Sequence, residues 1–92
     1  MPNTPPAGKR EYDYIAMSKA MERIEQARCN GDTVLDLSGL GLTTLPETLG
    51  KLTALQRLYL SKNQLTSVPE VLGKLTKLRV LDLVNNHLTN LP

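Results

Sequence analysis

A segment of 23 residues that occurs three times limits what this chain can fold into. The copies begin at Asp32, Leu55 and Leu78 and cover residues 32–54, 55–77 and, in part, 78–92. The first two copies are identical at 12 of 23 positions, several-fold more than unrelated segments would share. Self-similarity at a period of this length is typical of stacked repeats, in which each copy is one structural unit.

Leucine recurs within each copy at positions that alternate with other residues: Leu35 and Leu37, Leu58 and Leu60, Leu81 and Leu83. This alternation predicts a short strand with one buried face. A proline closes the next part of each copy and prevents the strand from continuing. Beyond it, two leucines three residues apart surround Gly50 or Gly73, which favours a 3₁₀ or helical turn. Stacked copies would join their strands into a parallel sheet over one leucine core.

Asn63 and Asn86 occupy the same repeat position, directly after the predicted strand. A side-chain amide there can donate to and accept from the tightly turned backbone, and we expect these bonds in its own repeat and the next. The equivalent residue of the first copy is Leu40. That substitution suits a terminal repeat with an atypical neighbour.

An amphipathic helix is predicted before the repeats, over residues 11–31. Its apolar stripe consists of Met17, Ala20, Met21, Ile24 and Ala27. Asp13 is the expected N-cap, and Asn30-Gly31 the expected stop. We expect the helix to cap the open end of the repeats, with Met21 and Ile24 buried against the first strand. A coiled-coil or membrane-surface helix is less favoured, because the stripe is short and the polar face is not strongly basic.

Composition limits the partners and the cellular compartment that we expect for the protein. Residues 1–10 contain three prolines and no large apolar residue after Met1, which predicts a disordered tail. The net charge of +2, from 11 basic and 9 acidic residues, is too small and too mixed to favour nucleic acid. We see no signal peptide and no membrane-spanning run. A single cysteine, Cys29, cannot form an internal disulfide, so we expect a cytoplasmic protein.

The pattern L-x-x-L-x-L-x-x-N-x-L-x-x-[LV]-P-x-x-L-G-x-L-x-x is complete in residues 55–77 and resembles the intracellular 23-residue leucine-rich repeat. The resemblance implies an α/β solenoid with short parallel strands on its concave face, an N-terminal capping helix and an array that is incomplete at the C-terminus. The phrase LDLSGLGLTTLPETLG is similar to the start of repeat arrays in bacterial and plant proteins, among them the Roco group, which joins such repeats to a Ras-like GTPase module.

Catalytic chemistry is not indicated. His87 is the single histidine, and Glu47 and Glu70 recur with the repeat, which favours a structural role for them. The chain contains no G-x-x-x-x-G-K-[ST] motif, so a GTPase domain would have to lie outside it. We therefore expect no enzyme, no catalytic residues, no metal and no cofactor.

The positions between the leucines should point away from the core. Those we expect to bind a partner are Val34, Asp36, Arg57, Tyr59, Ser61, Val80, Asp82 and Val84. Stacking would place Tyr59 between Asp36 and Asp82, close to Arg57. Tyrosine and arginine are common interface hot spots. In the alternative interpretation, Arg57 merely neutralises the two carboxylates on a solvated sheet.

These patterns predict a protein–protein interaction module that binds its partner on the concave face of the sheet. The alternative is a regulatory repeat segment of a larger signalling protein linked to a GTPase or a kinase. The leucines of the third copy, from Leu81 to Leu91, have no following repeat to pack on. We therefore expect that copy either to fray or to self-associate through its edge.

Overall fold

The computed structural model describes residues 11–88, and this part of the chain forms one long helix, three strands and two 3₁₀ helices. In chain order these are α1 (Glu11–Asn30), β1 (Val34–Asp36), η1 (Glu47–Lys51), β2 (Arg57–Tyr59), η2 (Glu70–Lys74) and β3 (Val80–Asp82). Each strand and each 3₁₀ helix falls where the repeat pattern predicts one. The predicted disordered tail, residues 1–10, and the last leucine, Leu91, lie outside the described residues.

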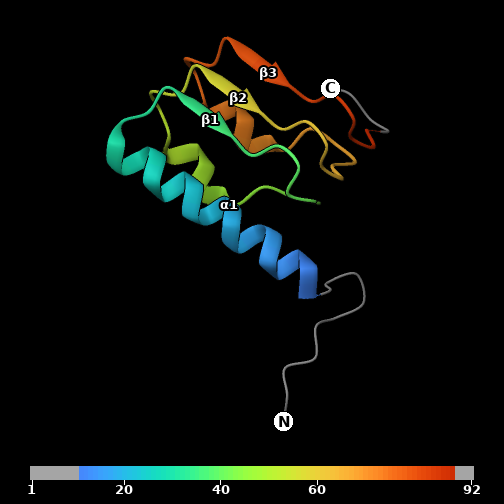
Figure 1. Ribbon diagram of the computed structural model, residues 1–92. Helices are drawn as coiled ribbons and strands as arrows, with labels where there is room; N and C mark the ends of the chain where they lie inside the picture. The colour runs from blue at the N-terminus through green and yellow to red at the C-terminus, as the bar shows by residue number, and fades with distance from the viewer. Residues whose placement is uncertain (1–10, 89–92) are drawn as a thin grey trace.

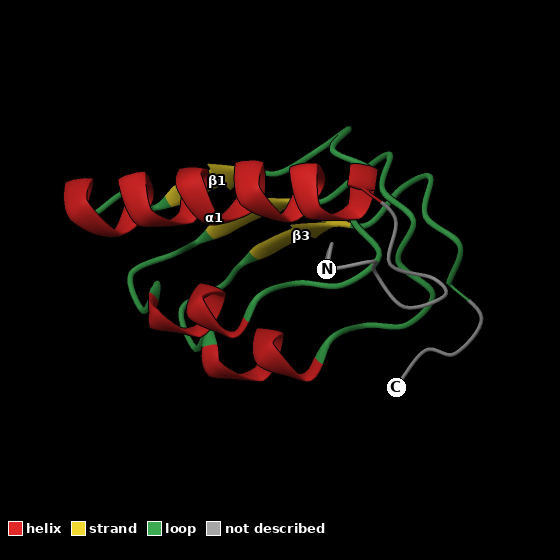
Figure 2. Ribbon diagram, turned by 90° about the horizontal axis from the view of Figure 1, so that it is seen from below, coloured by secondary structure: helices red, strands yellow, loops and turns green. Residues whose placement is uncertain are grey.

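The three strands form a parallel sheet in the order β1-β2-β3, with equivalent residues of successive copies side by side. The register pairs Val34 with Arg57 and Val80, Leu35 with Leu58 and Leu81, and Asp36 with Tyr59 and Asp82. Figure 1 shows β2 between its two neighbours, with α1 running beside β1. Figure 2 shows the two 3₁₀ helices next to each other, on the return side of the repeats. Each copy therefore contributes one strand and, in the first two copies, one return helix.

The core between the sheet and the return side is aliphatic. Its most completely buried leucines, each at most 1% exposed, are Leu37, Leu42, Leu49, Leu55, Leu58, Leu60 and Leu65. Full burial of one such side chain contributes about 1.5–3 kcal/mol relative to its exposed state. Because these leucines come from two successive copies and pack together, neither copy could bury them alone.

An asparagine ladder joins the turns of successive copies. The buried Asn63 Nδ2 donates to the carbonyls of Leu37, at 2.9 Å, and Leu60, at 3.0 Å, while its Oδ1 accepts from the Leu42 N–H at 2.8 Å. Asn86 repeats the pattern on Leu60, Leu83 and Leu65. The predicted amide role is confirmed, but its direction was wrong, because each amide reaches back to the preceding repeat and not forward to the next.

The direction of the ladder explains the exception in the first copy. An amide that reaches back needs an earlier repeat to bond to, and the first copy has α1 on that side instead. Leu40, which stands at this position, is partly buried and packs against the leucine core. A leucine suits this place because an asparagine here would find no turn of an earlier repeat to pair with.

In the turn after each strand, one residue has a left-handed backbone conformation, and it stands at the same repeat position in every copy. Gly39 has φ of +70°, Lys62 of +57° and Asn85 of +61°. Glycine adopts this conformation freely and asparagine tolerates it, but a lysine does so at a cost of about 1 kcal/mol. The turn is thus imposed by the repeat geometry even where the local residue opposes it.

The helix α1 lies against β1 and η1 through a narrow apolar face. Its buried residues are Ala16, Ala20, Ile24 and Ala27. Met21 is 46% exposed, so the prediction that it packs on the first strand was wrong. Residues spaced by four, four and three share one side of a helix, and Met21 falls outside that stripe. Alanines on the buried side let the helix approach the core closely.

The two ends of α1 differ in how well the sequence indicated them. The helix begins at Glu11, so Asp13 lies inside it and the predicted N-cap was wrong. The predicted stop is confirmed, since the N–H groups of Gly31 and Asp32 donate to the carbonyls of Arg28 and Ala27. With Gly31 at φ of +67°, these two bonds form a Schellman motif.

Candidate functional site: the open face of the sheet

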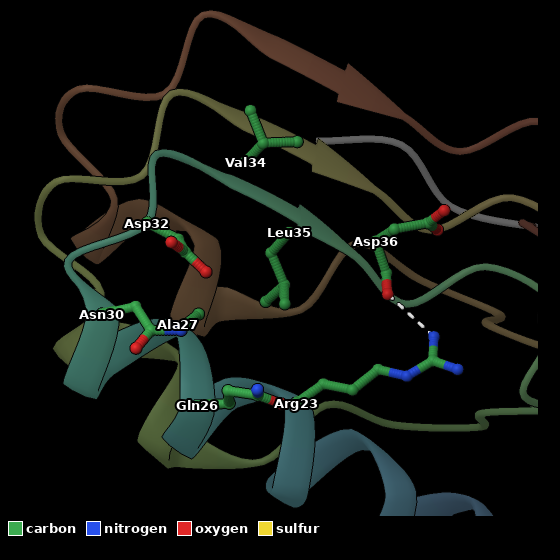
Figure 3. A pocket seen from close by; sticks show the side chains of 8 residues that line it. All are labelled: Arg23, Gln26, Ala27, Asn30, Asp32, Val34, Leu35 and Asp36. Carbon is green, nitrogen blue, oxygen red and sulfur yellow. Dashed lines mark hydrogen bonds between the residues drawn. The ribbon is translucent and has the colours of Figure 1, made fainter.

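The side of the sheet that points away from the leucine core is called the open face below. It consists of Val34, Asp36, Arg57, Tyr59, Val80 and Asp82. Alternation along each strand separates these residues from the core: Val34 is 47% exposed, whereas Leu35 beside it is 5% exposed. Figure 3 shows these two side chains on opposite sides of β1. The predicted rows of outward residues are therefore present, with Tyr59 in the central position.

The two remaining candidates lie beyond the strands. Ser61 is half-buried, and its Oγ donates to the Oγ of Ser38 at 3.1 Å in the neighbouring copy. Val84 occupies the equivalent position of the third copy and is 62% exposed. This third row therefore continues the open face past the C-terminal ends of the strands.

The carboxylates of the open face are held by their own turns. The Asp36 Oδ1 accepts a hydrogen bond from the Ser38 N–H at 2.9 Å, and the Asp82 Oδ1 accepts one from the Val84 N–H at 3.0 Å. The bond from the Ser38 backbone, with a smaller contribution from the charge of Arg23, lowers the pKa of Asp36 below its ordinary value. Both aspartates thus stabilise the turns that follow their strands.

Arg57 is left without an ion pair on this face. Within residues 11–88, no salt bridge joins it to Asp36 or Asp82. Both carboxylates bond to turn amides, and the alternative interpretation, in which Arg57 neutralises them on a solvated sheet, stays a prediction. Arg57 lines a small hollow of about 140 Å³ with Gln56, Arg79 and Val80.

Arg79 was missed by the sequence analysis. It directly precedes β3, outside the alternating outward positions from which the candidates were chosen. One signal was available: the register pairs Arg57 with Val80, so the residue before Val80 had to lie near Arg57. The pair therefore lies where β2 and β3 begin, at a position that alternation along the strands does not indicate.

A second hollow, of about 340 Å³, lies between α1 and β1 (Figure 3). It is lined by Arg23, Gln26, Ala27, Asn30, Asp32, Val34, Leu35 and Asp36. The Nη1 of Arg23 donates to the backbone carbonyl of Asp36 at 2.9 Å, on the edge of β1 that faces away from β2. Arg23 thereby occupies a place where another strand's N–H would bond, which protects this edge from strand addition.

Other chemistry finds little support in the described part of the chain. No group of three or more His, Cys, Asp or Glu side chains there could hold a metal ion. Cys29 is exposed, beside the ion pair of Arg28 and Glu25. Among the described helices, none has the length and apolar character needed to span a membrane.

A parallel sheet with one strand per 23-residue copy, an aliphatic core of leucines and an asparagine ladder defines a leucine-rich repeat protein. The family model for the leucine rich repeat matches residues 33–88, more than half of the chain, and the chain belongs to this family. A comparison with curated proteins gave no match. Leucine-rich repeat domains generally mediate protein–protein interaction and are typically not enzymes. The likeness to Roco-type proteins stays a prediction.

Proposed function

We propose that this chain is a protein-interaction module whose partner docks on the open face, with Tyr59 at the centre of the contact. The observation that carries the proposal is the position of Tyr59 in the middle strand, between Asp36 and Asp82 and near Arg57, which forms no salt bridge within residues 11–88. A tyrosine offers a large amphipathic surface at little entropic cost. Val34 and Val80, 47% and 40% exposed, extend the apolar area on both sides of Arg57.

The scaffold beneath this face supports the proposal. On one side of β2 the Leu37 N–H donates to the carbonyl of Tyr59 at 2.8 Å, and on the other the Leu60 N–H donates to the carbonyl of Asp82 at 2.8 Å. The leucines behind the strand are fully buried. These bonds fix the backbone that carries Tyr59. The side chain therefore starts from a pre-organised position, which lowers the entropic cost of binding. We place the module in the cytoplasm, where the lone, exposed Cys29 would stay reduced.

A photo-crosslinking experiment tests the docking site. Benzoylphenylalanine in place of Tyr59 should capture a partner, and the same group in place of Lys74, on the return side, should not. The affinity of the captured protein is then measured by calorimetry. Tyr59→Ala with Arg57→Ala should weaken binding by about 2 kcal/mol, roughly thirtyfold. The control is the double change Lys51→Ala and Lys74→Ala. If the control removes binding and the first pair does not, the proposal is wrong.

Self-association through the edge of β3 is a second candidate, favoured by one observation. Leu81 belongs to the core row, yet it is 37% exposed, whereas Leu58 beside it is fully buried. Exposed strand edges with apolar side chains tend to pair with other chains. Light scattering over a concentration series should then show a dimer that Leu81→Lys dissociates, and a concentration-independent monomer would exclude this candidate.

A further inference from the structure

Two arginines, Arg57 and Arg79, lie near each other where β2 and β3 begin. The register pairs Arg57 with Val80, and Arg79 immediately precedes Val80. Neighbouring strands lie about 4.8 Å apart, so the two basic residues lie close together. Both are exposed, and both line the hollow of about 140 Å³ that Gln56 and Val80 complete.

The backbone beneath this hollow is fixed on both sides. The N–H groups of Arg79 and Val80 donate to the Gln56 carbonyl at 2.8 and 3.0 Å. The N–H groups of Gln56 and Arg57 donate in turn to the Thr33 carbonyl at 2.7 and 3.0 Å. The two arginines therefore extend from a rigid support, although their guanidinium groups stay free to adjust.

Neither Arg57 nor Arg79 forms a salt bridge within residues 11–88. The ion pairs found within residues 11–88 join Arg28 to Glu25 and Lys74 to Glu47, on α1 and on the return side. The acids of the open face bond to turn amides beyond the other ends of the strands. Two like charges side by side repel each other, so an anion between them would relieve that repulsion.

We propose that the open face binds an acidic segment of a protein partner, with one carboxylate held between Arg57 and Arg79. Guanidinium groups match a carboxylate in geometry and can each donate two parallel hydrogen bonds to it. The exposed Val80 at the rim of the hollow adds an aliphatic contact. The inference rests on the proposed function and deepens it, because it names the chemistry of the partner.

Charge also sets the direction in which the segment lies. The entrances of β2 and β3 carry Arg57 and Arg79, whereas Asp36 and Asp82 stand at the C-terminal ends of β1 and β3 and the exposed Asp32 precedes β1. An acidic residue is attracted at the first place and repelled at the second. The acidic part of the segment therefore lies over the entrances of β2 and β3, and its neutral or basic part crosses Tyr59.

Fluorescence anisotropy on the full chain tests this inference. The probes are a short labelled peptide of alternating Glu and Val, the same peptide with Gln in place of Glu, and a single-stranded oligonucleotide of similar length. The Glu peptide should bind best, with an affinity that falls as salt is added. Arg57→Glu with Arg79→Glu should weaken its binding about tenfold or more. The control, Lys51→Glu with Lys74→Glu, has the same net charge and should bind nearly as well as the unchanged protein.

Three outcomes would overturn the inference: equal weakening by both double variants, equal binding of the Glu and Gln peptides, or tightest binding of the oligonucleotide. Circular dichroism checks that each variant is folded. Failure here is distinguishable from failure of the proposed function. If Tyr59→Ala weakens binding of the captured partner and Arg79→Glu does not, the acidic-segment inference fails alone. If Arg79→Glu weakens it and Tyr59→Ala does not, the central role of Tyr59 fails and the charge inference stands.

Discussion

The two faces of the sheet follow different rules. On the core face, paired positions hold the same residue in every copy, as with Leu35, Leu58 and Leu81. On the open face, the residues of β2 differ from those paired with them in β1 and β3, so that Arg57 stands between two valines and Tyr59 between two aspartates. Stacking demands one shape at the core and leaves the outward positions free. Repetition therefore marks structure in this chain, and variation marks the places where a binding surface can be built.

Each face has exceptions, which show that the role of a residue depends on the strands and turns beside it as well as on the face to which it points. Leu81 points to the core but is 37% exposed, because the described chain places no further strand beyond β3. Asp36 and Asp82 stand on the open face, yet their carboxylates hold turns. The comparison of faces is thus sharpest in the middle strand, which has a neighbour on both sides.

The largest effect is expected at the buried side of α1. Ile24 is 2% exposed, so Ile24→Asp would place an unpaired charge in the core and should destabilise the domain by several kcal/mol. The matched control is Met21→Asp on the exposed side of the same helix, which should change stability by less than about 0.5 kcal/mol. Thermal unfolding followed by circular dichroism separates the two. Equal melting temperatures would contradict the packing of α1 on the repeats.

The next effect contrasts two leucines of one row. Leu58 is completely buried, so Leu58→Ala should cost about 3 kcal/mol through lost burial and the cavity left behind. Leu81→Ala should cost about 1 kcal/mol, since this side chain is already 37% exposed. Urea unfolding measures both changes. A loss at Leu81 as large as at Leu58 would show that β3 has a neighbour in solution.

A smaller effect is expected from the asparagine ladder. Asn63 is 3% exposed and bonds to the backbone of two repeats. Asn63→Ala would leave buried backbone groups unpaired and should cost about 2 kcal/mol. Asn86→Ala should cost about half as much, because its surroundings are only partly buried. Equal unfolding midpoints of the two variants in urea would contradict the expected difference between the buried and the partly buried asparagine.

The sequence predicted the framework well because stacking leaves a periodic record. The strands, the 3₁₀ helices, the register and the stop at Gly31 all follow from residues that recur or from a turn that favours glycine. The face of α1 was harder to assign, since a single helix has no second copy for comparison and both Met21 and Ile24 are apolar. The position of Arg57 and Arg79 around one hollow was not predicted, because Arg79 precedes β3 and no repetition marks the two arginines.

A weak dependence on pH is expected from Asp36. The Ser38 N–H lowers its pKa in the folded protein, so the stabilisation is present above the ordinary pKa of aspartate, about 3.9, and is lost as the pH falls through the lowered value. Asp36→Asn should remove this part of the acid sensitivity. The difference should stay well below about 1 kcal/mol, because the group is largely exposed. Urea midpoints from neutral to acidic pH that run parallel in both proteins would contradict it.

Residues on the core face of the sheet stabilise the fold, whereas residues on the open face can be changed with little loss of stability and are available to bind a partner. The free energies of unfolding of Tyr59→Ala and Leu58→Ala, measured side by side in urea, test this claim most directly, because the two residues are adjacent in β2 and point to opposite faces. We predict a change within about 0.5 kcal/mol for Tyr59→Ala and a loss of about 3 kcal/mol for Leu58→Ala. A loss at Tyr59 that equals the loss at Leu58 would contradict the claim.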